Sequence, residues 1–137
     1  MPTVTRIIHF CYGHRLLDYR GKCRHLHGHN GRIEVTLHKA RLDSLDMVMD
    51  FERIKSLIEK WVKTEIDHRM LLNARDPLAA VLRRAGEPEV LMRGNPTAEN
   101  IARLILKRGR AMRLPVVRVR LWETRDSYAQ VGPLRLP

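Results

Sequence analysis

Five of the seven histidines lie within the first 29 residues, and the densest group is the run Cys23-Arg24-His25-Leu26-His27-Gly28-His29. In an extended chain, side chains two residues apart point to the same side, so His27 and His29 can converge on one ion. His14 is the best candidate for a third ligand. Three protein ligands with an open fourth position are typical of a catalytic zinc site. The spacing therefore predicts a zinc centre at these three histidines, although imidazoles also suit iron, copper or nickel.

Cys23 precedes His27 by four residues and has two possible roles. It could be a fourth ligand that closes the metal site, or a reactive thiol beside an open site. The spacing does not choose between these roles. Cys11, the other cysteine, follows an apolar run and is predicted to be a small core residue. Two cysteines are too few for a disulfide framework, so both are expected to be thiols in a reducing cytoplasm.

The predicted strands would bring these histidines together. Residues 3–10 are rich in β-branched types, and residues 31–40 alternate between apolar and polar, which favours a half-buried antiparallel strand. The polar segment 16–30 between them is predicted to be a loop or a distorted hairpin connection. If the two strands are hairpin neighbours, His14 comes close to His27 and His29.

The rest of the chain contains two strong helix starts and two more strand patterns. Asp50 is placed to cap an amphipathic helix that ends near Ile66, and Thr97 is placed to cap a second helix. Further patterns indicate a short helix at 78–85 and strands at 115–124 and 127–131. Runs of strands, then helices, then strands predict an α+β fold with an antiparallel sheet. No repeat or linker interrupts the chain, so a single domain over residues 1–137 is expected.

The composition excludes some classes of protein. The hydrophobic fraction of 44% and the charged fraction of 30% are those of an ordinary globular protein. No apolar run approaches the roughly 20 residues of a membrane span, so no membrane partner is expected. The net charge of +11 suits nucleic acid, a polyanionic small substrate or simply a solvated basic surface. The basic residues are spread along the chain and aromatic residues make up only 5%, which disfavours a nucleic-acid partner.

Six sequence blocks, in order along the chain, resemble the 6-pyruvoyltetrahydropterin synthase family. They are Phe10 to His14, Cys23-x-x-x-His27-Gly28-His29, Met49-Asp50-Phe51, Asp67-His68, Asn95-Pro96-Thr97-Ala98-Glu99-Asn100 and Glu123-Thr124. The three-residue spacing between the cysteine and the first histidine is most similar to the bacterial 6-carboxytetrahydropterin synthases of the queuosine pathway. Each block alone is weak, but together they are highly specific.

The resemblance implies a tunnelling fold, in which the strand pairs of several subunits join into a barrel. Members of this family are typically homohexamers of two trimers, with active sites between subunits. The implied reaction converts 7,8-dihydroneopterin triphosphate to 6-carboxy-5,6,7,8-tetrahydropterin, acetaldehyde and triphosphate. The enzyme would then be a carbon–carbon lyase.

The resemblance also implies roles for individual residues. Its zinc ligands correspond to His14, His27 and His29. Its catalytic thiol corresponds to Cys23, its proton-relay pair to Asp67 and His68, its pterin anchor to Glu123, and one residue of its pocket lining to Thr97. Taken singly, Asp67 could instead end the first helix, and Glu123 could pair with an arginine across the strands. The sequence departs from the family at Gly31, where many relatives have an aromatic residue, and over residues 75–94, which are longer than in compact members.

Two alternative functions remain at this point. A 6-pyruvoyltetrahydropterin synthase would eliminate triphosphate without releasing the two-carbon fragment. A non-enzymatic, zinc-stabilised nucleic-acid-binding module would explain the charge of +11 and would use Cys23 as a fourth zinc ligand.

Overall fold

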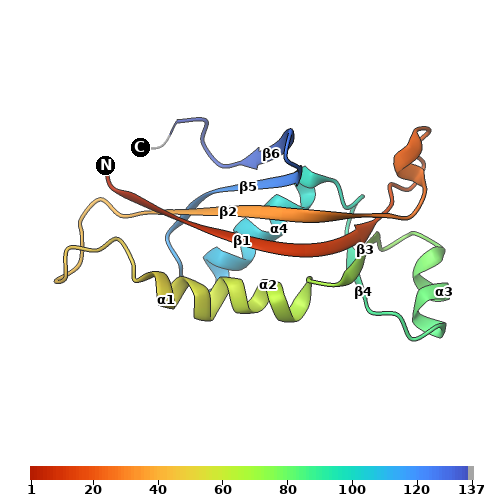
Figure 1. Ribbon diagram of the computed structural model, residues 1–137, viewed down its shortest axis with the longest axis horizontal. Coiled ribbons are helices and arrows are strands. Elements are labelled where there is room, and N and C mark those ends of the chain that lie inside the picture. Colours follow the sequence, from red (N-terminus) through yellow and green to blue (C-terminus); the bar gives the residue numbers. More distant parts are fainter. Residues whose placement is uncertain (136–137) are drawn as a thin grey trace.

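A hairpin of two long strands forms the centre of the fold (Figure 1). The computed structural model describes residues 1–135. Strand β1 (Thr3–His14) pairs antiparallel with β2 (His27–His38), in a register that sets His14 opposite His27. Both strands are longer than predicted, because the pairing continues to the end of the hairpin. The histidines expected in a loop therefore lie on paired strands, where their directions are fixed.

The hairpin belongs to a six-stranded sheet in the order β4-β3-β1-β2-β5-β6. The predicted antiparallel pair β5 (Val116–Thr124) and β6 (Ser127–Val131) is confirmed and lies beside β2. A bulge opposite Thr36 and Leu37 shifts the register of β5, so Val116 is buried where the alternation favoured Val117. The other edge carries two short strands that run parallel to β1, β3 (Arg69–Asn73) and β4 (Glu89–Met92). Residues 67–73 were expected to be a turn or a short extended piece, whereas β4 and the parallel pairing were not predicted.

Helices cover one face of this sheet and bury a single cluster of apolar side chains against it (Figure 1). The first helix is a continuous rod made of α1 (Phe51–Ile54), a π-helical segment (Lys55–Glu59) and α2 (Lys60–Glu65). The Asp50 carboxylate accepts the backbone N–H of Glu52, which confirms the predicted cap.

Helix α4 (Ala98–Ala111) is the second long helix of this layer. The Thr97 hydroxyl accepts the N–H of Asn100 and caps it, as predicted. Gly109 does not end the helix. Its missing side chain lets the helix lie directly on β5, because a Cβ there would come within 2.8 Å of Val116.

Two short helical segments lie at the end of the sheet where the hairpin turns. They are the 3-10 turn η1 (Lys22–Arg24), in the β1–β2 connection, and α3 (Leu78–Arg84), between β3 and β4. The predicted short helix is confirmed. Because β3 pairs with the last residues of β1, the segment that precedes β3 is held against the hairpin near the histidines.

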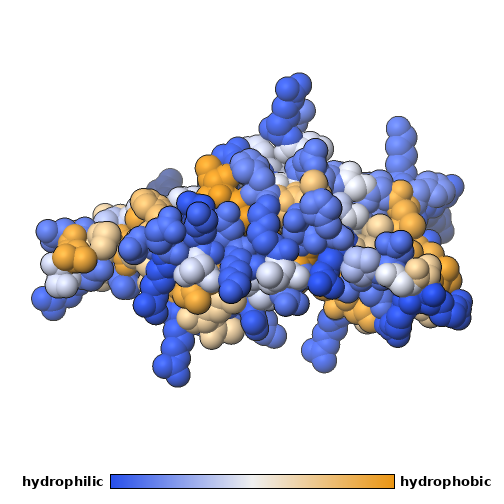
Figure 2. Space-filling view, turned by 60° about the horizontal axis from the view of Figure 1, so that its bottom comes forward, coloured by the Kyte–Doolittle hydropathy of each residue, from blue (hydrophilic) through white to orange (hydrophobic). Residues whose placement is uncertain are grey.

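Hydrophilic residues cover most of the surface shown in Figure 2, and hydrophobic residues appear there as scattered patches. Among the described residues, none of the helices has the length and apolar character needed to cross a membrane.

A buried ion pair joins the end of β1 to the start of α3 and gives a prediction about stability. Arg15 donates to Asp76, whose side chain is fully buried, and this bond holds the pKa of Asp76 below its ordinary value. Replacing Asp76 with alanine removes the partner of Arg15, which is itself a quarter exposed, and the acceptor of the Leu78 N–H, and should lower the free energy of unfolding by about 2 kcal/mol at pH 7.

The effect of this pair depends on pH with a definite sign. A carboxylate with a lowered folded-state pKa stabilises the protein above its unfolded value of about 3.9, and the stabilisation is lost as the pH falls through the folded value. Urea denaturation at pH 7 and pH 3 should therefore show that the difference in free energy of unfolding between wild type and Asp76→Ala is smaller at pH 3. Asp126→Ala, at an exposed turn, is the control and should change little. An equal difference at both pH values would contradict the role of the ion pair.

Candidate active site

Three histidine side chains meet where the central hairpin turns. His14 ends β1, while His27 and His29 begin β2, and all three point to the face of the sheet that carries the helices. Their ligand atoms lie within 4.8 Å of one another, and the Nε2 atoms of His14 and His29 are 3.1 Å apart. The structure thus brings together the three residues that the spacing predicted as ligands.

Hydrogen bonds on the far side of two rings orient their ligand atoms. His14 donates from Nδ1 to the carbonyl of Pro96 at 2.7 Å, and His27 donates from Nδ1 to the carbonyl of His25 at 2.8 Å. Each bond fixes the tautomer in which Nδ1 carries the proton and Nε2 has a free lone pair. Histidines that bind zinc usually donate their other ring N–H to a carbonyl or carboxylate in this way. The carbonyl of Pro96 therefore explains why the block before α4 belongs to the site.

The electrostatics of the cluster suit a cation. Burial lowers the pKa of His14 and of His29, which favours the neutral imidazole that binds a metal. The Nε2 atoms of His14 and His29 are 3.1 Å apart, close enough to share a proton or to bind one cation. A donor set of three imidazoles fits zinc.

A cavity of about 370 Å³ lies beside His14, the buried member of the three histidines, and contains four of the predicted site residues. Its lining includes His14, Cys23, Thr97 and Glu123. Cys23 is half-buried, and its carbonyl accepts the N–H of Leu16, which holds η1 against the hairpin. Among the described residues, the potential metal group contains the three histidines without Cys23. This arrangement suits a thiol beside an open site better than a fourth ligand.

Glu123 faces the histidines. Its two carboxylate oxygens lie 3.9 Å from the Nε2 atoms of His14 and His29. The hydroxyl of Tyr12 donates to Oε1 at 3.3 Å, and burial together with the Glu123 charge raises the pKa of Tyr12, so the phenol stays protonated. The cross-strand pairing of Glu123 with an arginine, the other interpretation from the sequence, is absent from the ion pairs of the described residues.

Asp67 and His68 form a dyad at the open edge of β1. The His68 ring lies with Nδ1 2.8 Å from the Asp67 carboxylate, and its backbone has a φ of 58°, in the left-handed region. Backbone groups of Cys11 hold both residues: its N–H donates to Asp67 at 2.8 Å, and its carbonyl accepts the His68 N–H at 2.7 Å. Burial alone would raise the pKa of Asp67, but the bonds from Cys11 and His68 outweigh it and lower that pKa. The dyad is therefore an ionised carboxylate that orients an exposed imidazole.

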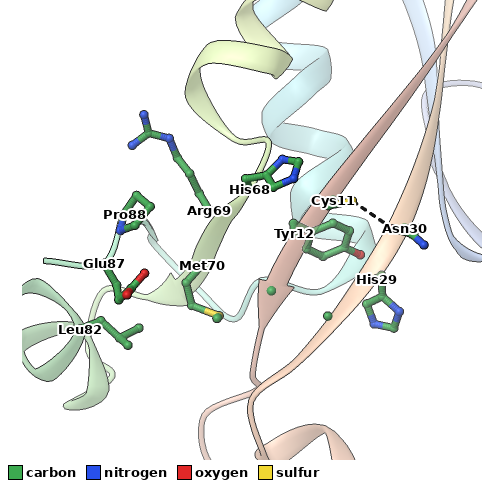
Figure 3. Close-up of a pocket in the computed structure, with 12 residues that line it drawn as sticks. Cys11, Tyr12, His29, Asn30, His68, Arg69, Met70, Leu82, Glu87 and Pro88 are labelled. Carbon is green, nitrogen blue, oxygen red and sulfur yellow. Dashed lines mark hydrogen bonds between the residues drawn. The ribbon is translucent and has the colours of Figure 1, made fainter. Parts of the chain in front are cut away.

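His68 lines a different cavity, of about 490 Å³, which is shown in Figure 3 and which His29 also lines. In this view His68 and His29 stand apart, on either side of Tyr12. Within one chain, His68 therefore does not share a cavity with Cys23. Cys11 also lines this second cavity, where its thiol donates to the Asn30 side chain at 3.0 Å. The prediction that Cys11 is a core residue is wrong, because odd-numbered residues of this part of β1 face away from the helices.

Two residues that shape the site were not singled out from the sequence. Tyr12 touches both His14 and Glu123 and lies within the block Phe10 to His14, but a tyrosine within an apolar alternation by itself predicts only core packing. Asn95 bonds the N–H and the carbonyl of Leu17 through its side chain and so ties the β1–β2 connection to the segment before α4. Its position within a recognised block was the available signal.

Comparison with known proteins agrees with this geometry. A protein from Rickettsia typhi named 6-carboxy-5,6,7,8-tetrahydropterin synthase is 35% identical over 138 residues, which covers 96% of this chain and 100% of the relative. A protein of the same name from Aquifex aeolicus is 35% identical over 122 residues, covering 80% of this chain and 75% of the relative.

Solved structures show the same fold. An uncharacterised protein from Wolinella succinogenes superposes with a TM-score of 0.78 at 26% identity, covering 96% of this chain and 97% of that one. The 6-pyruvoyl tetrahydropterin synthase of Caenorhabditis elegans superposes with a TM-score of 0.70 at 24% identity, covering 97% of both chains. The α+β tunnelling fold predicted from the sequence is thereby confirmed. The sequence profile described as 6-pyruvoyl tetrahydropterin synthase matches residues 3–133, and the chain belongs to this family.

Proposed function

We propose that this protein is a zinc-dependent lyase that converts 7,8-dihydroneopterin triphosphate and water to 6-carboxy-5,6,7,8-tetrahydropterin, acetaldehyde and triphosphate. The observation that carries the proposal is the three-histidine cluster at the side of a cavity that also contains Cys23 and Glu123. The names of the curated relatives support the carboxy-forming reaction. The pathway would be 7-deazaguanine (queuosine) biosynthesis in the cytoplasm.

Each group in the cavity has a role that its chemistry suits. Zinc held by the three histidines would act as a Lewis acid toward the hydroxyls of the substrate side chain. Cys23 accepts a proton from carbon as the general base. Glu123 accepts paired hydrogen bonds from the N–H edge of the pterin ring, and such two-point bonds to a carboxylate fix orientation. Thr97 caps α4 at the wall of the same cavity.

The proton relay of Asp67 and His68 needs a second copy of the chain in this proposal. His68 lines a cavity that contains neither Cys23 nor Glu123, and its imidazole is 76% exposed, so it is free to meet another molecule. We place it in the active site of a neighbouring subunit of a homohexamer, where His68 returns a proton to the substrate. Asp67 holds the ring in position for that transfer.

Mixing inactive variants tests this shared site. Cys23→Ala and His68→Ala each disable one component, and mixed oligomers would regain roughly a quarter of the sites if the two residues come from different copies. The matched control mixes Cys23→Ala with Glu123→Gln, which line one cavity of one chain and should regain nothing. Recovery in the control, or none in the first mixture, would contradict the arrangement.

Product analysis tests the reaction itself. Incubation with 7,8-dihydroneopterin triphosphate should release triphosphate and acetaldehyde together. Triphosphate without acetaldehyde would instead indicate the 6-pyruvoyltetrahydropterin synthase reaction. Release of neither product would contradict both pterin functions.

A further inference from the structure

The ring of Tyr12 is fixed on the core face of the hairpin, two residues before the end of β1. The side chain is only 3% exposed. The ring stacks on Phe10, with centroids 4.9 Å apart and planes 13° from parallel, and it meets the His14 ring edge-on at 5.2 Å. A phenol held on two sides in this way places its hydroxyl at a defined point.

Gly31 leaves the space in which this ring lies. Gly31 pairs with Phe10 across the hairpin, and the next residue, Arg32, pairs with Trp122 of β5. Gly31 therefore lies between the rings of Phe10 and Tyr12 on one side and the end of β5 that carries Glu123 on the other. A Cβ at this position would come within 2.5 Å of the Phe10 ring and 3.0 Å of the Tyr12 ring. Even alanine would displace the rings.

The hydroxyl of Tyr12 crosses this space to the carboxylate of Glu123. It donates to Oε1 at 3.3 Å, and Oε1 and Oε2 lie 3.9 Å from His14 and His29 respectively. Both oxygens therefore have a definite neighbour, and rotation of the carboxylate would break the bond to Tyr12.

We propose that Tyr12 is a positioning residue that orients the Glu123 carboxylate for pterin binding, and that Gly31 leaves the space that the Tyr12 ring requires. This inference rests on the proposed function, in which Glu123 holds the ring edge of the pterin. A ring edge can donate two parallel hydrogen bonds only to a carboxylate that lies in the plane of the ring. Tyr12 holds the Glu123 carboxylate in one orientation before the ligand binds. Tyr12 and Gly31 thus preorganise Glu123 for ligands with two adjacent N–H donors on a flat ring.

The test uses the zinc-loaded protein and neopterin, a fluorescent pterin without a triphosphate to eliminate. Tyr12→Phe keeps the ring but removes the hydroxyl, and should raise the Kd for neopterin about tenfold. The KM for the substrate should rise by a similar factor while kcat changes little, because ring binding is shared by ground and transition states. Tyr19→Phe removes a hydroxyl from a half-exposed tyrosine and should leave the Kd unchanged.

A second variant, on β2, disturbs the same contact between Tyr12 and Glu123. Gly31→Ala keeps the hydroxyl but displaces the ring, so it should also weaken neopterin binding. The proposal is overturned if either variant binds neopterin as wild type does, or if Tyr12→Phe acts by losing zinc. A Glu123→Gln protein that binds neopterin normally, or a wild type that does not bind it, would overturn the anchoring role of Glu123 and this inference with it.

Discussion

Replacing His27 with alanine is expected to remove zinc and to abolish turnover. Only two imidazoles would remain of a group whose ligand atoms lie within 4.8 Å of one another. Loss of a supporting bond around a zinc site already weakens binding about 10- to 100-fold, so loss of a ligand should exceed 100-fold. Zinc per chain after dialysis, measured by elemental analysis, and acetaldehyde release should both fall to background.

His25→Ala is the matched control for this variant. His25 lies two residues away and contributes only its backbone carbonyl to His27, which alanine keeps. Its ring is outside the three-histidine group of the described residues. Zinc content and turnover should therefore stay near wild type. Loss of zinc in His25→Ala with retention in His27→Ala would mean that His25, and not His27, is the ligand.

Replacing Cys23 with alanine should give the opposite combination: full zinc content and almost no turnover. The thiol lines the cavity beside the histidines but is not part of the ligand group among the described residues. Removing a general base typically costs about 10²- to 10⁴-fold in rate. The measurements are zinc per chain, the midpoint of thermal unfolding and the rate of acetaldehyde release.

Cys11→Ala controls for the loss of a thiol. Cys11 lies on the opposite face of the sheet, where its thiol bonds Asn30, and its backbone bonds to Asp67 and His68 survive the substitution. Its rate should remain close to wild type. If Cys23→Ala loses zinc or fails to fold, the site is a closed structural one, as the zinc-stabilised nucleic-acid-binding module requires.

The sequence predicted the hairpin, the capped helices and the last strand pair, because each has a clear period or cap. Asp50 and Thr97 bond the first N–H groups of their helices as expected. Residues 67–73 were predicted only as a turn or a short extended piece, and neither β4 nor the parallel pairing of β3 was predicted. Their pairing partners are distant in sequence. No local pattern predicts that a short apolar stretch will pair with the edge of a sheet.

The candidate site was predictable in its residue types and only partly in its arrangement. Spacing was enough for His14, His27 and His29, because strand geometry fixes which neighbours share a face. It could not place His68, whose position follows from the bonds of Asp67 and His68 to Cys11 at the edge of β1. Nor could it reveal Tyr12, whose function depends on the space left by Gly31 on the neighbouring strand.

Zinc content and acetaldehyde release, measured on the same preparations, test the central claim most directly. Protein stripped by a chelator and reloaded stepwise with zinc should release acetaldehyde from 7,8-dihydroneopterin triphosphate in proportion to the zinc bound per chain. Full turnover by the stripped protein, or no acetaldehyde from the fully loaded protein, would contradict a zinc-dependent carboxy-forming lyase.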